Sequence, residues 1–191
     1  MANWCSNDLY IYGEPEEIKR FLFANIGFPA SPPPEGEVLT PRFCFNACVP
    51  VGATFDPDQD EIAAEELWGT KWDIYRENLT HDSICLREDD TSIVLSFDTA
   101  WSPPSEWLKK VASMHPSVIL ILHYEESGFS LAGDIVCKGD IAIENEYDEE
   151  KSKEVFRYIQ DDSAEPYEIN TDMLLSQIRT ILEKDRNTPS S

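Results

Sequence analysis

The stretch SFDTAWSPPSEWLKK, residues Ser96–Lys110, predicts a corner at which a β-strand is followed by an α-helix. Ser102 is a favoured residue at a helix N-cap, and Pro103 is favoured in the first turn, where its missing N–H costs little. Trp101 and Trp107 flank this start and are expected to anchor the helix on a sheet. We therefore interpret the prolines and tryptophans as parts of the fold rather than as a reaction site.

Apolar patterns on either side of this corner predict the sheet. Val118–Tyr124 (VILILHY) is continuously apolar, as in a strand at the centre of a sheet. Trp4–Tyr12 alternates and predicts a first strand, and a helix follows from Glu14. The apolar stripe of that helix consists of Ile18, Phe21, Leu22 and Ile26. Further strands are expected at 43–48, 72–77, 83–86, 92–97 and 129–145, the last broken at Gly133 and Gly139.

This order of strands and helices predicts an α+β fold, an antiparallel sheet with helices packed on one face. Residues 1–145 are expected to form that domain, with an acidic insertion at 53–67 that contains a short helix. Residues 146–191 are rich in acids and predict a helical C-terminal extension. Within it, Asp172–Lys184 has the clearest amphipathic pattern.

The charge of the chain restricts its partners. There are 37 acidic and 15 basic side chains, a net charge of −22. Such a charge disfavours direct contact with nucleic-acid phosphates or anionic membranes, so a partner in nucleic-acid biology is expected to be a basic protein. The sequence has no apolar run of membrane-spanning length and no signal-peptide pattern at its start, which predicts a cytoplasmic protein.

Motifs for metal binding or catalysis are missing from the sequence. Cys44 and Cys48 are the closest pair of the five cysteines, expected on one side of a strand, and we interpret them as reduced, buried thiols. The histidines, His81, His115 and His123, lie in no catalytic signature, and no glycine-rich phosphate loop occurs. We expect no metal, no cofactor and no enzymatic activity.

Asp98 has the best claim to chemistry among the acids, because it ends an apolar strand just before a helix. With His123 or a neighbouring acid it could act as a general acid or base. The favoured interpretation is structural: Asp98 accepts hydrogen bonds from backbone amides or a tryptophan indole and holds the corner in place.

Two clusters of acids remain, and their ordinary role is a solvated surface that keeps the protein soluble. The alternative is a charge array that resembles nucleic acid and binds the basic groove of a DNA- or RNA-handling protein. The candidate partner-binding residues are Asp56, Asp58, Asp60, Glu61, Glu65, Glu66, Asp140, Glu144, Glu146, Asp148, Glu149, Glu150, Glu154, Asp161 and Asp162.

Four motifs resemble a family of plasmid and bacteriophage proteins, the YubB-like family. They are NWCSNDLYIYG (Asn3–Gly13), WGTKWD (Trp68–Asp73), SFDTAWSPP (Ser96–Pro104) and ESGFSLAGDIV (Glu126–Val136). The resemblance implies a ferredoxin-like α+β sandwich and an origin on a mobile element. It supplies no catalytic residues and no cofactor, and it does not extend to the acidic residues beyond 145.

Charge and resemblance together lead to one functional expectation. The chain would be a phage or plasmid protein, in the cytoplasm of a bacterial host, that inhibits a host defence or nucleic-acid-processing complex by mimicking nucleic acid. An adaptor that binds a protein through its sheet edge or its C-terminal helix is the alternative. An enzyme that uses Asp98 comes third.

Overall fold

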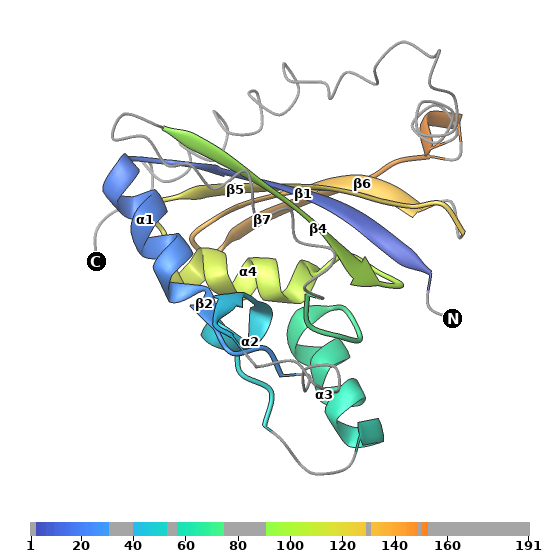
Figure 1. Cartoon of the computed structure of the whole chain (residues 1–191). Helices are drawn as coiled ribbons and strands as arrows, with labels where there is room; N and C mark the ends of the chain where they lie inside the picture. Colours follow the sequence, from blue (N-terminus) through green and yellow to red (C-terminus); the bar gives the residue numbers. More distant parts are fainter. Residues whose placement is uncertain are drawn as a thin grey trace.

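A computed structural model of the chain describes residues 3–30, 40–52, 57–74, 91–128, 131–148 and 150–152. These residues form a five-stranded antiparallel sheet with strand order β4-β1-β5-β6-β7 (Figure 1). The strands are β1 (Trp4–Tyr12), β4 (Ser92–Ala100), β5 (Ile119–Glu126), β6 (Leu131–Lys138) and β7 (Ile141–Glu146). A two-stranded ladder pairs β2 (Ile26–Gly27) with β3 (Arg42–Phe43).

The first strand lies between two strands that are distant in sequence. Leu9 of β1 pairs with Leu95 of β4 on one side and with Leu122 of β5 on the other, antiparallel to both. Strands β4 and β5 are therefore parallel to each other, and α4 (Ser105–Met114) connects them. This split β-α-β arrangement is characteristic of ferredoxin-like folds, and the predicted α+β class is confirmed.

Helices α1 (Pro15–Ala24), α2 (Phe45–Cys48), α3 (Pro57–Trp68) and α4 lie on one side of the sheet (Figure 1). Trp107 of α4 is completely buried, with its ring centroid 4.8 Å from that of Phe45 and 5.9 Å from that of Phe43. Trp107 thus anchors its helix as predicted. Trp101 follows β4 directly, with a φ of 72° and 37% of its surface exposed.

The capping of α4 differs from the prediction. The helix begins at Ser105 with Pro104 at its N-cap, two residues later than expected. Ser102 is not the cap, because its hydroxyl Oγ donates a hydrogen bond of 2.7 Å to the carbonyl of Gly69. Ser102, which the local sequence predicts as the N-cap, instead connects this corner to the segment that follows α3.

The strand predicted at 43–48 is also wrong. Within it only Phe43 belongs to a strand, β3; Cys44 is the extended N-cap residue, and Phe45–Cys48 form the short helix α2. Its first two amides, those of Phe45 and Asn46, donate hydrogen bonds of 2.8 Å and 3.3 Å to the carboxylate of Asp73. Asp73 is distant in sequence, so the alternating pattern could not reveal the interaction that favours a helix here.

Three further expectations differ. Ile26 lies in β2 and is 45% exposed, so it is not part of the buried face of α1. Trp72, Asp73 and Ile74 form no strand, and the rest of the segment 72–77, like 83–86, lies outside the described residues. Gly133 lies within β6 and does not interrupt it. A glycine is needed at this position because a Cβ there would come within 2.4 Å of the carbonyl oxygen of Asn145.

Candidate functional site

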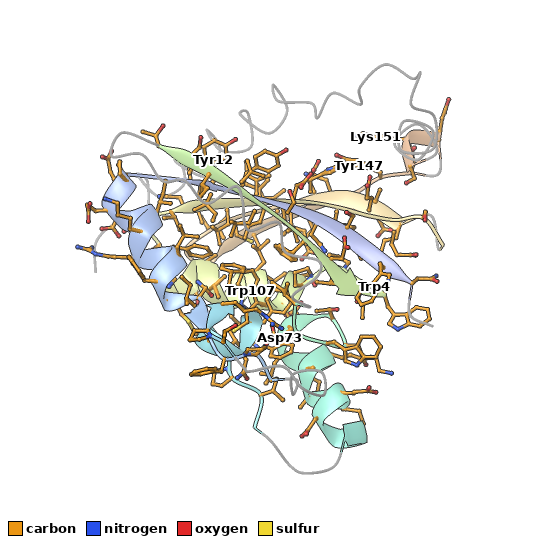
Figure 2. All side chains as sticks on the ribbon, viewed as in Figure 1. Trp4, Tyr12, Asp73, Trp107, Tyr147 and Lys151 are labelled. Atoms are coloured by element: carbon orange, nitrogen blue, oxygen red, sulfur yellow. The ribbon has the colours of Figure 1, made fainter. Side chains whose placement is uncertain are left out.

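The face of the sheet opposite α1–α4, called the outer face below, has an apolar half and a polar half. Strand register places its side chains in rows, and Tyr12 and Tyr147 both lie on this side, whereas Trp107 and Asp73 lie among the helices (Figure 2). The apolar rows contain Val94, Tyr10, Ile121, Val136, Ile143, Tyr12, Ile119 and Ile141. The polar rows contain Ser96, Asp8, His123, Asp134 and Asn145, then Asp98, Ser6 and Glu125.

A buried hydrogen-bonded network occupies the polar half over β5 and β6. His123 and Asp134 pair across the two strands, with Nδ1 of His123 2.9 Å from Oδ1 of Asp134. The hydroxyl of Tyr147 donates a hydrogen bond to the other carboxylate oxygen of Asp134. The ammonium of Lys151 lies 3.5 Å from the centroid of the Tyr147 ring. The chain after β7 is thus attached to the outer face by buried polar contacts, which are strong where water is excluded.

Three carboxylates gather beside this network, on β1, β4 and β5. Asp8 lies opposite His123 in the register, and Ser6 lies between Asp98 and Glu125. Burial raises the pKa of Asp98, while a hydrogen bond with Ser6 opposes the increase. Burial also raises the pKa of Glu125; repulsion from Asp8 and Asp98 adds to that effect, and attraction to His123 opposes it. The polar half therefore holds carboxylates whose negative charges repel one another.

The two predicted catalytic candidates, Asp98 and His123, have different hydrogen-bond partners. Asp98 and His123 share the outer face, but the carboxylate paired with His123 is that of Asp134. The hydrogen-bond partner of the Asp98 side chain is Ser6 rather than a backbone amide or an indole. Sequence reasoning missed Asp8 and Glu125, although an acid at an outward position of an alternating strand is a usable signal.

The predicted partner-binding acids lie on several elements. Those described and exposed are Glu65 and Glu66 of α3, Asp140 in the β6–β7 turn, Glu144 and Glu146 of β7, and Asp148 and Glu150 beyond it. Asp60 and Glu61 of α3 are partly buried. The side chains of Asp56, Asp58, Glu149, Glu154, Asp161 and Asp162 lie outside the described residues, as does the segment Asp172–Lys184.

Internal cations partly neutralise two of these acids. Glu61 Oε2 lies 2.8 Å from Nζ of Lys71, and the indole of Trp72 donates to Oε1, so the pKa of Glu61 is lowered. Glu144 Oε1 lies 2.7 Å from Nζ of Lys109, which also pairs with Glu106 Oε1 at 2.9 Å. Glu61 and Glu144 therefore offer a partner less free charge than their neighbours do.

Comparison with known proteins identifies one region. Residues 80–170 match the family model of the ferredoxin-like domain in Api92-like protein. The match includes β4, α4, β5, β6 and β7, whereas β1, which completes the centre of the sheet, lies before it. Neither a curated protein nor a solved structure matches the chain.

The described residues contain no group of three His, Cys, Asp or Glu side chains arranged to hold a metal ion. Within the same residues, no helix is long and apolar enough to cross a membrane.

Proposed function

We propose that this chain is a YubB-like protein of a phage or plasmid that binds and inhibits a host defence or nucleic-acid-processing complex through acidic surface. The four sequence motifs support the YubB-like family, and the match at 80–170 supports a ferredoxin-like domain. The net charge of −22 supports a partner whose own binding surface is basic.

The observation that carries the proposal is the gathering of Asp8, Asp98 and Glu125 on the outer face. Burial raises the pKa of Glu125, and repulsion from Asp8 and Asp98 adds to this increase, which opposes folding when Glu125 is ionised. A partner that places lysine or arginine among them would replace repulsion by attraction. Such a surface gains more from a basic partner than the same number of separated, fully solvated acids would.

Four exposed acids that follow β6 add further negative charge. Asp140 lies at one end of β7, and Glu146, Asp148 and Glu150 lie at its other end and beyond. We assign Glu61 and Glu144 smaller parts in binding, because Lys71 and Lys109 already compensate them.

Capture of partners from host lysate by the full chain, at low and high salt, tests the mechanism. A triple variant, Asp8→Asn, Asp98→Asn and Glu125→Gln, is expected to lose the partner that the parent retains at low salt. The matched control, Glu14→Gln, Glu16→Gln and Glu17→Gln, removes the same charge from the N-cap and first turn of α1. This control variant should still bind the partner. Binding that survives both the triple variant and high salt would reject mimicry and favour the adaptor alternative.

A general acid–base site is a second candidate, favoured by the buried pair of His123 and Asp134. A carboxylate on Nδ1 holds an imidazole in one tautomer and orientation, as acid–base catalysis requires. Asp98 lies on the same face as a further acid. Folded Asp98→Asn and His123→Gln variants that both keep full protection of the phage or plasmid in the host would exclude this candidate.

A further inference from the structure

Three side chains with soft or borderline donor atoms meet where α2 and α4 end. Sγ of Cys48, the last residue of α2, lies 3.9 Å from Sδ of Met114, the last residue of α4. The same Sγ lies 4.0 Å from Nε2 of His115, which is the C-cap of α4. The thiol of Cys48 therefore lies within about 4 Å of both a thioether and an imidazole from the end of another helix.

We propose that Cys48, Met114 and His115 form a binding site for Cu(I). In a trigonal plane, bonds of about 2.3 Å to sulfur and about 2.0 Å to nitrogen, the lengths known for zinc, separate two sulfurs by about 4.0 Å and a sulfur from a nitrogen by about 3.7 Å. The two distances from Cys48 are close to these values.

The donor set selects the metal. Thiolate and thioether sulfur favour Cu(I), whereas magnesium, calcium and manganese prefer oxygen. Structural zinc sites use cysteine, histidine and carboxylate ligands, usually four of them, and thioether sulfur is not among them. One of the three donors is the thioether of Met114, so the set is not composed of histidine, cysteine and acidic side chains alone.

The surroundings hold these donors in place. The His115 ring packs edge-on against Phe21, with centroids 5.4 Å apart and an interplanar angle of 77°. The backbone amide of His115 donates to the carbonyls of Val111 and Ala112, which fixes the end of α4. Cys48 is partly buried against the main hydrophobic core. No basic residue lies in the last turn of α4, so the negative end of its dipole is available to a cation.

The donors are accessible to an ion. Met114 is 55% exposed and Cys48 is partly exposed, whereas Cys5, Cys44 and Cys137 are buried. On binding, the S–H bond of Cys48 breaks, its proton passes to water and the sulfur bonds to copper, with no change in oxidation state.

Titration of the reduced, full-length protein with Cu(I) alone, without oxygen and against a chromophoric chelator, tests the site. We expect one bound ion, with two sulfur and one nitrogen neighbours by X-ray absorption. Met114→Leu keeps the volume of an exposed side chain and should weaken affinity by about tenfold or more, because even ligand-supporting residues have effects of that size. Cys48→Ser should abolish binding. Cys85→Ser, a change at the remaining cysteine of the chain, should leave binding unchanged.

Three results would overturn the site. They are binding to Cys48→Ser as tight as to the parent, an unchanged affinity in Met114→Leu, or an absorption spectrum with a single sulfur neighbour. Circular dichroism establishes that each variant is folded. If Cys48→Ser does not fold, Met114→Leu and the spectrum of the parent still decide the question.

Discussion

Replacement of Asp73 by asparagine is expected to be the most damaging small change in the described residues. The carboxylate is buried, and each of its oxygens accepts two backbone hydrogen bonds. Oδ1 accepts from Phe45 at 2.8 Å and from Ile74 at 2.9 Å. Oδ2 accepts from Ala30 at 3.2 Å and from Asn46 at 3.3 Å.

An asparagine has the same shape but only one accepting oxygen. Its amide NH₂ would face two backbone N–H donors, so two hydrogen bonds to a charged group are lost. At about 1.5–3 kcal/mol for each such bond, Asp73→Asn should lower the free energy of unfolding by about 3–6 kcal/mol. That is a large part of the roughly 5–15 kcal/mol that stabilises a typical domain.

Denaturant unfolding followed by tryptophan fluorescence measures this loss, with Asp140→Asn, an exposed acid in the β6–β7 turn, as the control. The control should change the free energy of unfolding by no more than about 0.5 kcal/mol. Hydrogen exchange should also show faster exchange at the amides of Phe45 and Asn46. If Asp73→Asn unfolds within about 0.5 kcal/mol of the parent, the carboxylate does not hold α2 and the reasoning is refuted.

Three other changes have defined outcomes. Trp107→Ala removes a fully buried indole and should cost about 3–5 kcal/mol in chemical denaturation. Gly133→Ala should cost about 1–3 kcal/mol, because the new Cβ would lie 2.4 Å from the carbonyl oxygen of Asn145 and 2.5 Å from the hydroxyl of Tyr124; a cost near zero would mean that β6 and β7 can separate freely. Because the pKa of Glu125 is raised in the folded state, its contribution to stability is present below its unfolded pKa and is lost as pH rises through the folded pKa. Glu125→Gln should therefore flatten the fall in unfolding free energy over that pH range, and an unchanged pH profile would contradict the raised pKa.

The main elements follow from local pattern because side-chain periodicity is local. The alternation of β1 and the stripe of α1 that includes Phe21 and Leu22 indicate which face is buried. The continuous apolar run of β5 indicates a strand buried on both faces. Errors arose where a distant residue overrode that pattern. The segment 43–48 alternates like a strand, yet Asp73 stabilises a helix within it, and Ser102 bonds to Gly69 rather than capping α4.

The candidate sites needed more than local pattern. His123 and Asp134 lie opposite each other in a hairpin, so their pairing required a register that hydrophobicity alone does not fix. Asp8, Asp98 and Glu125 share a face because β1 lies between β4 and β5. Cys48 approaches Met114 and His115 because α2 lies at the end of α4.

The amino-acid sequence by itself determined the α+β class, the strong negative charge and most strand and helix positions, because each depends on composition or on neighbours within a few residues. Only the tertiary structure decided which acids repel one another, which are compensated by lysines and which donors converge at the end of α4. Those features depend on contacts between residues far apart in the chain, and the order and register of the strands bring these residues together.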